Sequence, residues 1–198
     1  MKNSTNFIKW TLHHAWVILV SYIAGVILLL IIHGSFGYSM NEDGTYLSNA
    51  LMHMGSGFVL ALGTGILQRE LLKKHFRVSY SWVFSLIAGF LSAELLAGIV
   101  LWKLEIYRGL INIFNTTNHL PEALIFALAG LIAGILQYSL LKSYCTKRIY
   151  WIISSTLGWA FLILSTYLGL AAFLLGALLY GAITGFVLYN VLEFKKSS

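Results

Sequence analysis

The sequence alternates long apolar runs with short polar segments, and the lengths of the runs predict membrane-spanning helices. A helix needs about 20 mostly apolar residues to cross a bilayer. Six stretches reach or approach that length, and they are 15–32, 48–68, 81–102, 122–141, 149–168 and 171–193. The pattern predicts an all-α, multi-pass membrane protein in which residues 1–198 form a single integral membrane domain.

The last two stretches form one continuous uncharged run that is too long for a single span. Residues 149–192 contain no Asp, Glu, Lys, Arg or His. As one helix this run would be about 66 Å long, whereas the hydrocarbon core of a bilayer is about 30 Å thick. The chain must therefore fold back, and we expect the turn at Gly169, since glycine accepts the backbone conformations that end helices.

The positions of the positive charges predict the orientation of these spans. With six spans, eleven Lys and Arg residues lie in segments on the side of the two termini, and two lie on the other side. The loop 33–47 has no Lys or Arg, whereas 69–80 has four and 142–148 has three. Cytoplasmic loops carry the excess of positive charge. Both termini are therefore predicted to be cytoplasmic, in the cell membrane of a bacterium.

Composition supports a membrane protein and excludes several other classes. The chain is 59% hydrophobic and only 10% charged, whereas soluble domains carry about 25% charged residues. The net charge of +6 is gathered in short clusters between apolar runs, a pattern typical of membrane topology and not of a nucleic-acid site. Cys145 is the only cysteine, so the chain forms no internal disulfide. The expected partners are membrane lipids, with a membrane-protein partner or further copies of the chain as the other possibilities.

Part of the pattern is written twice. Residues 49–95 align without a gap to residues 118–164, with fourteen identities in 47 positions. The identities include Gly65/Gly134, Gln68/Gln137 and Trp82/Trp151. Each copy predicts a helical hairpin with a basic turn, and the two hairpins share one orientation, as in a parallel repeat. We expect the tryptophans to lie in the aromatic belt of the cytoplasmic interface.

Two resemblances to known families rest on these residues. The duplicated pattern of Gly, Gln, Leu, basic turn and Trp, followed by "GAITG", resembles a group of small, uncharacterised multi-span bacterial membrane proteins over roughly residues 50–194. A weaker resemblance, to VanZ-like membrane proteins, rests on His53 at the start of the second span and Glu94 in the third. The VanZ resemblance implies a role in the cell envelope or in antibiotic resistance.

Candidate functional residues fall into two groups. Glu94 is the one acidic residue well inside a predicted span, where an ionised carboxylate costs on the order of 3 kcal/mol. His53 is predicted at a similar depth in the outer half of the bundle, near Asn49 and Glu122, so the four residues form a candidate polar pocket or a buried structural pair. Gln68 and Gln137 end their helices beside the basic turns, where they serve in capping, interhelical hydrogen bonding or a polar pair at the inner mouth.

No catalytic signature accompanies these residues. The sequence contains no HExxH, no nucleotide-binding loop and no CxxC. Adjacent His13 and His14 are about 100° apart on a helix, a poor geometry for one metal ion, and we expect both at the interface. The sequence thus predicts no catalytic residue, no metal site and no cofactor. It favours binding or transport of a small solute or lipid, with a membrane scaffold or accessory subunit as the alternative. An enzymatic function is not favoured.

Overall fold

The computed structural model describes residues 2–35, 45–73, 77–103, 120–166 and 168–194. Within these ranges the chain forms six α-helices, which are α1 (Lys2–Ser35), α2 (Thr45–Leu72), α3 (Ser81–Lys103), α5 (Leu120–Leu140), α6 (Ile149–Thr166) and α7 (Leu170–Phe186). The shorter elements are a 3-10 turn (Leu141–Ser143), β1 (Cys145–Thr146), a π-helix (Val187–Val191) and β2 (Glu193–Phe194). The described chain is therefore mostly helical, as the apolar runs predict.

The helices differ from the predicted spans mainly at the two ends of the chain. The first begins at Lys2 instead of residue 15, so α1 is about 51 Å long at 1.5 Å per residue. The last ends as an α-helix at Phe186 instead of residue 193. The apolar run marks only the part of a helix that is long enough to span a membrane, and not where the helix itself begins or ends.

The turn between α6 and α7 lies at Gly169, as predicted. Gly169 has φ of 91° and ψ of 176° and directly precedes α7. This region of backbone space is essentially restricted to glycine. A single residue therefore divides the uncharged run into two helices that pack against each other.

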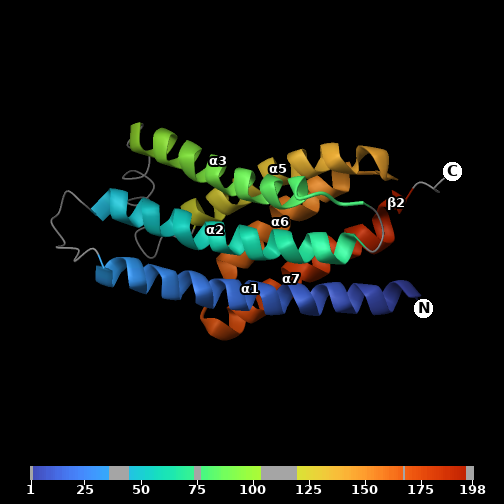
Figure 1. Ribbon diagram of the computed structural model, residues 1–198, viewed down its shortest axis with the longest axis horizontal. Coiled ribbons are helices and arrows are strands. Elements are labelled where there is room, and N and C mark those ends of the chain that lie inside the picture. Colours follow the sequence, from blue (N-terminus) through green and yellow to red (C-terminus); the bar gives the residue numbers. More distant parts are fainter. Residues whose placement is uncertain (1, 36–44, 74–76, 104–119, 167, 195–198) are drawn as a thin grey trace.

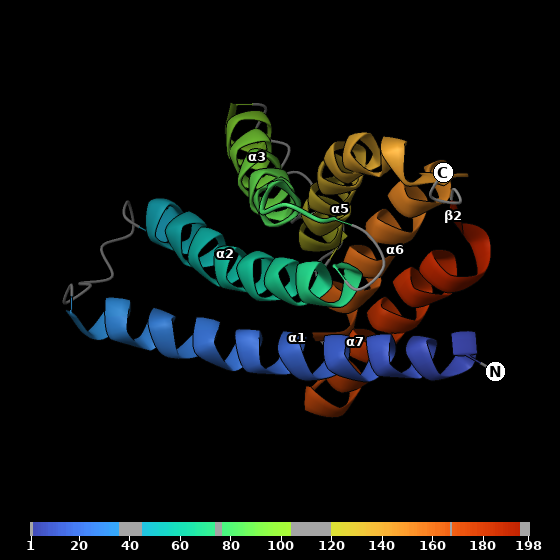
Figure 2. The same ribbon diagram turned by 45° about the vertical axis from the view of Figure 1, so that its right-hand side comes forward.

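The helices form a closed ring. Each described helix packs against the next one along the chain, and α1 packs against α7 to close the ring. Figures 1 and 2 show α1 and α7 side by side in both views. The N-terminus, the C-terminus and the turns after α2 and α5 lie at the same end of the bundle (Figure 1). We call this end the basic end, because the turns 69–80 and 142–148 carry much of the positive charge.

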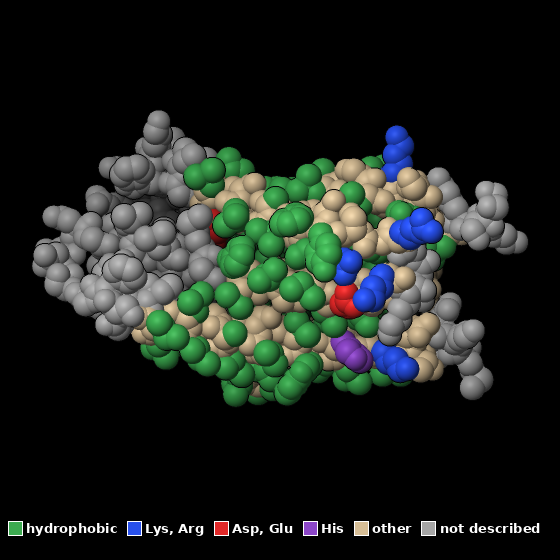
Figure 3. Space-filling model, in the orientation of Figure 1, with side chains coloured by type: hydrophobic (Ala, Val, Ile, Leu, Met, Phe, Trp, Pro, Cys, Tyr) green, Lys and Arg blue, Asp and Glu red, His purple; other side chains and the backbone are tan. Residues whose placement is uncertain are grey.

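The outside of the bundle is apolar between its ends. On α1, one face exposes Ile8, Leu12, Trp16, Val20, Ile23 and Ile27. Figure 3 shows hydrophobic side chains over the middle of the molecule and Lys and Arg side chains at the basic end. Among the described residues, three stretches of helix are long and apolar enough to cross a membrane, and they are Thr5–Leu28, Ala123–Ser143 and Leu170–Val191. An exposed apolar surface of this extent is typical of contact with lipid.

The α2–α3 and α5–α6 hairpins are held together by the same contacts. A Cβ atom on Gly65 would lie 3.1 Å from Cα of Val83, and one on Gly134 would lie 3.0 Å from Cα of Ile152. Both contacts join residues at the same sequence separation. Glycine lets the backbones of the paired helices approach closely at both positions, where an added Cβ would be in tight contact.

Candidate functional site

Two clusters of buried apolar side chains fill the inside of the bundle. The smaller one, which we call the end cluster, lies toward the basic end and consists of Trp10, Leu72, Trp82, Leu141, Cys145, Trp151, Val187, Leu188 and Leu192. The larger one, the main cluster, consists of Ile18, Leu60, Ala61, Leu86, Phe90, Ala93, Phe126, Ala129, Ala133, Trp159, Leu162, Phe173, Ala177 and Tyr180. Each of the six helices contributes to the main cluster.

Buried polar side chains lie between the two clusters. On α1, for example, His14 lies between Trp10 of the end cluster and Ile18 of the main cluster. On every described helix a buried polar residue occupies this intermediate position along the chain. We call the set the polar layer, and its members are His14, Thr64, Gln68, Ser85, Gln137, Ser154, Ser155 and Thr184.

Three tryptophans of the end cluster donate their indole N–H groups into the polar layer. Trp10 Nε1 lies 3.1 Å from Thr184 Oγ1, Trp82 Nε1 lies 2.9 Å from Gln68 Oε1, and Trp151 Nε1 lies 2.7 Å from Gln137 Oε1. The rings of Trp82 and Trp10 both contact that of Trp151, with centroids 5.5 and 6.4 Å apart. The three indoles therefore join α1, α3 and α6 and form the boundary of the layer.

Gln68 and Gln137 make the same bond to tryptophan but differ in their other bonds. An indole N–H only donates, so in both residues the oxygen faces the tryptophan and the amide NH₂ points elsewhere. In Gln68 this NH₂ donates to the Tyr180 hydroxyl at 3.0 Å. In Gln137 the buried Nε2 has no hydrogen-bond partner among the described residues. Among the described residues, the Gln68 amide thus has a partner for both its oxygen and its nitrogen, whereas the Gln137 amide has a partner for its oxygen alone.

His14 contributes a free acceptor to the polar layer. Its side chain is fully buried between the rings of Trp10 and Tyr180, with centroid distances of 4.4 and 5.7 Å. Its Nδ1 lies 2.8 Å from the Trp10 carbonyl oxygen. A carbonyl only accepts, so a neutral His14 carries its proton on Nδ1 and presents a lone pair on Nε2. Nε2 is buried and has no partner within the described chain.

Thr64 adds a hydroxyl group to the unpaired atoms of this layer. It lies one turn from Gln68 on α2, and its Oγ1 is buried without a partner in the described structure. A buried polar atom that lacks a hydrogen bond costs about 1–3 kcal/mol. Three atoms of the layer, a donor, an acceptor and a hydroxyl oxygen, thus have unused hydrogen-bonding capacity among the described residues.

The described part of the polar layer is uncharged. The buried polar side chains are histidine, serine, threonine and glutamine, and no Asp, Glu, Lys or Arg is fully buried among the described residues. Arg69, which follows Gln68, is partly buried, and its Nε atom is buried without a partner there. With His14 in its neutral form, the layer provides hydrogen bonds without a compensating charge for an ion. This chemistry matches an uncharged, hydrogen-bonding ligand better than an ion, which would lose its hydration without gaining a counter-charge.

The four residues of the predicted outer pocket are described only in part. Glu94 lies on α3 and is partly buried. Asn49 and His53 lie on α2 and Glu122 lies on α5, but their side chains fall outside the described residues. The outer pocket thus remains a prediction, and the inner pair Gln68 and Gln137 is the part of the candidate site whose geometry is visible.

Two positional expectations were wrong. Trp82 and Trp151 lie inside the bundle, each 1% exposed, and not in an aromatic belt, because Gln68 and Gln137 bind their indole N–H groups. His14 is buried instead of interfacial, while His13 is exposed and bonded to the Lys9 carbonyl oxygen. The spacing of Trp10, His14 and Ile18 was the missed signal, since residues four apart share one face of a helix.

The turns at the basic end are closed by arginine–tyrosine contacts. The Arg69 guanidinium lies 3.9 Å from the ring centroid of Tyr80, and the Arg148 guanidinium lies 4.3 Å from that of Tyr138. Arg69 and Tyr138 occupy aligned positions at the ends of α2 and α5. In the α2–α3 hairpin the first helix supplies the arginine and the turn supplies the tyrosine. In the α5–α6 hairpin the first helix supplies the tyrosine and the turn supplies the arginine, so both hairpins keep a cation–π contact.

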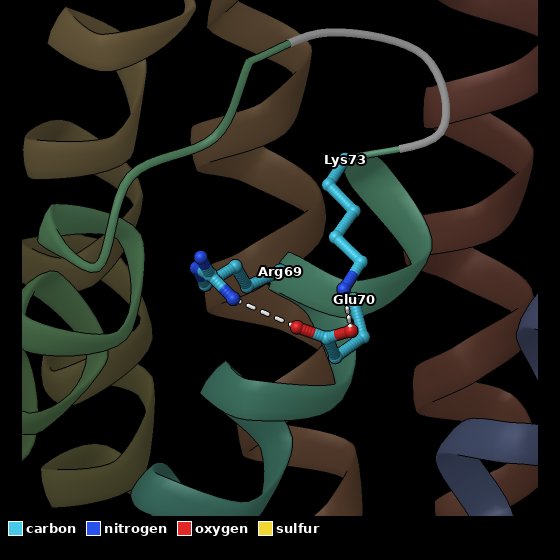
Figure 4. A network of polar contacts seen from close by, with 3 residues as sticks. All are labelled: Arg69, Glu70 and Lys73. Atoms are coloured by element: carbon cyan, nitrogen blue, oxygen red, sulfur yellow. Dashed lines mark hydrogen bonds and ion pairs between the residues drawn. The ribbon is translucent and has the colours of Figure 1, made fainter.

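A small charged network also lies at the end of α2, and Figure 4 shows its three residues. Arg69 Nη1 lies 2.7 Å from Glu70 Oε1, and Lys73 pairs with the other carboxylate oxygen. The hydrogen bond from Lys73 is the main cause that lowers the pKa of Glu70 below its ordinary value. The side chains of Glu70 and Lys73 are 42% and 50% exposed, whereas that of Arg69 is 20% exposed. Ion pairs this open to water add little to stability. The position of the network marks the boundary between the apolar bundle and water.

The comparisons with known proteins assign no family to this arrangement. No protein-family model, no curated protein and no solved structure matches the chain.

Proposed function

We propose that this chain is a six-span membrane protein whose polar layer binds a small, uncharged, hydrogen-bonding solute and passes it across the membrane. The proposed spans are the six described helices, with the α2–α3 and α5–α6 hairpins as parallel repeats. Both termini lie on the cytoplasmic side of a bacterial cell membrane. The positive charge at the basic end supports this orientation.

The observation that carries the proposal is the set of unpaired atoms in the polar layer. Gln137 Nε2, His14 Nε2 and Thr64 Oγ1 are buried without partners among the described residues. Buried polar groups are otherwise almost always hydrogen-bonded. A site that supplies a donor, an acceptor and a hydroxyl group suits a solute that carries both kinds of group, such as urea, glycerol or water.

The surrounding structure supports transport of a small molecule more than binding of a lipid. The helices around the layer approach closely, since a Cβ on Gly89 would lie 2.7 Å from the backbone nitrogen of Ala133. The polar layer also lies between two apolar clusters. This is the arrangement of a closed site, which a small solute enters only when one of the clusters opens.

The proposal is tested by permeation through liposomes that contain the purified protein. The probes are water, urea and glycerol, followed by light scattering after rapid mixing, in vesicles of phosphatidylethanolamine and phosphatidylglycerol. At least one probe should cross faster than in protein-free vesicles. His14→Phe and Gln137→Leu should each slow it by about tenfold, the effect of losing a hydrogen bond of about 1.4 kcal/mol in the rate-limiting state.

The matched control is Ser21→Ala. Ser21 is also a buried polar residue of α1, 6% exposed, but it lies beyond Ile18 and outside the polar layer. Its loss should leave permeation unchanged. If none of the three probes crosses faster than in empty vesicles, the transport proposal is lost, and a protein partner that co-purifies with the chain would favour the scaffold alternative.

A further inference from the structure

The C-terminal segment crosses the basic end of the bundle as a strap. After α7 the chain forms the π-helix Val187–Val191 and then β2, which pairs antiparallel with β1. In this pairing Cys145 faces Phe194, and Thr146 faces Glu193. We call residues 187–194 the strap, because they join the last helix to the turn between α5 and α6.

The outer side of the strap is held by exposed polar contacts. Lys147 Nζ lies 2.6 Å from Glu193 Oε1, and Thr146 Oγ1 donates to Glu193 Oε2 at 3.2 Å. Lys147 has φ of 55°, a left-handed conformation that is uncommon outside glycine. One carboxylate therefore joins two residues of the opposing turn. Contacts of this kind are exposed to water and break easily.

The inner side of the strap belongs to the end cluster. Val187, Leu188 and Leu192 are buried there together with Cys145, whose side chain is 1% exposed. These residues lie on the basic-end side of the polar layer, beyond Thr184 on α7 and Gln137 on α5. The strap thus contributes part of the apolar cover between the polar layer and the basic end.

The strap consists of short elements instead of a regular α-helix. A π-helix has a bond pattern that is less favourable than that of an α-helix and often occurs at functional sites. The pairing of β1 with β2 involves two residues on each side. Short elements with few backbone bonds open locally at low cost in free energy.

We propose that the strap is the gate of the polar layer, and that the pairing of β1 with β2 keeps the gate closed from the basic end. Release of Glu193 from Lys147 and Thr146 lets residues 187–194 lift away and carries Leu188 and Leu192 out of the end cluster. This inference rests on the proposed function, because a gate implies that a solute enters the polar layer. The movement of the strap itself can be measured without any solute.

Cys145 is a natural reporter of this movement, because it is the only cysteine and lies beneath the strap. The rate of its modification by a small methanethiosulfonate reagent should be low in the unaltered protein. Lys147→Glu should raise the rate by about threefold, the size expected for an exposed ion pair. Leu192→Ala should raise it by about tenfold or more, since it removes buried contacts as well.

Two controls separate strap opening from general loosening. The double variant Lys147→Glu with Glu193→Lys restores the opposite charges and should return the rate to its original value. Lys9→Glu makes the same charge change on exposed α1 at the basic end and should leave the rate unchanged. Equal rates in the unaltered protein, Lys147→Glu, the double variant and Lys9→Glu would overturn the claim that the ion pair holds the strap.

A second reporter tests whether the strap controls access to the polar layer. Ser154→Cys, made together with Cys145→Ser, places the thiol in the layer itself. Its modification should become faster with Lys147→Glu by the same factor as that of Cys145. If Cys145 responds and position 154 does not, the strap moves without gating the layer, and the inference is overturned while the proposed function stands.

Discussion

Gln68 and Gln137 differ in whether their buried amide nitrogen has a hydrogen-bond partner among the described residues. Gln68 and Gln137 were singled out from the sequence because the repeat preserves them, and both accept an indole N–H. The repeat gave no sign that they would differ, since the difference comes from Tyr180, which lies on α7 outside both copies. Its hydroxyl accepts a hydrogen bond from Gln68, whereas Gln137 Nε2 has no partner among the described residues. Residues brought together by tertiary packing leave no trace in sequence spacing.

The two glutamines should therefore differ in their contribution to stability. Gln68→Leu leaves both the Trp82 indole and the Tyr180 hydroxyl without their partner, and each unpaired group costs about 1–3 kcal/mol. Gln137→Leu leaves only the Trp151 indole unpaired and removes the free NH₂ group. We expect the first variant to lower the thermal unfolding midpoint in detergent more than the second. Equal shifts would contradict the bonding described for Gln68.

The helices of this protein were predictable as elements, and their ends and short connections were not. Apolar runs predicted α3, α5 and α6 closely, and Gly169 predicted the turn before α7. The strap was missed, because strands of two residues have no periodicity that a sequence shows. The last predicted span, 171–193, nearly matches the helical stretch Leu170–Val191, but the change from α-helix to π-helix after Phe186 was not predicted, because the uncharged run continues through it.

Packing between α3 and α5 should be sensitive to an added methyl group. In Gly89→Ala the new Cβ would lie 2.7 Å from the nitrogen of Ala133 and 2.8 Å from the oxygen of Ala129, both backbone atoms. The helices must separate, at a cost near 3 kcal/mol. Gly158→Ala, at the aligned position, would instead meet the ring of Tyr180 at 2.7 Å. Because a ring can turn, unfolding measurements should show a smaller loss.

The strap should also respond to pH through Glu193. The hydrogen bond from Lys147, followed by that from Thr146, lowers the pKa of Glu193 below its ordinary value of 4.5. A lowered pKa stabilises the closed strap above pH 4.5, and this stabilisation is lost as the pH falls through the lowered pKa. Lys147 is the charged group facing the carboxylate, with Tyr150 near the lysine.

A spin label at Phe194→Cys, in a Cys145→Ser background, measures this response. Its mobility should increase on acidification when Glu193 is present. With Glu193→Gln the mobility should be high already at neutral pH and should not change further. A label that stays immobile in acid would show that the carboxylate does not hold the strap.

The whole molecule is a ring of six described helices with most of its Lys and Arg residues toward one end. The lengths of the apolar runs predicted the helices, and the placement of Lys and Arg predicted that the basic turns share one end. The polar layer was not predicted, because it arises from six helices that each place one or two residues at the same depth. His14 belongs to it, although its neighbour His13 is exposed.

Membrane topology is testable with single cysteines in a Cys145→Ser background. Ser143 is exposed at the basic end, and Leu168, 80% exposed, lies at the turn before α7. A membrane-impermeant maleimide should label Leu168→Cys in intact cells, and Ser143→Cys only after the cells are permeabilised. The opposite pattern would invert the proposed orientation.

The central claim, that the polar layer holds a small uncharged ligand, is tested most directly by a cryo-electron microscopy map of the protein in lipid nanodiscs. At a resolution that shows ordered water, density should lie within hydrogen-bonding distance, about 2.7–3.2 Å, of Gln137 Nε2 and of His14 Nε2. It should disappear beside position 137 in Gln137→Leu. A map in which these atoms bond to other side chains, with no additional density in the layer, would contradict the account.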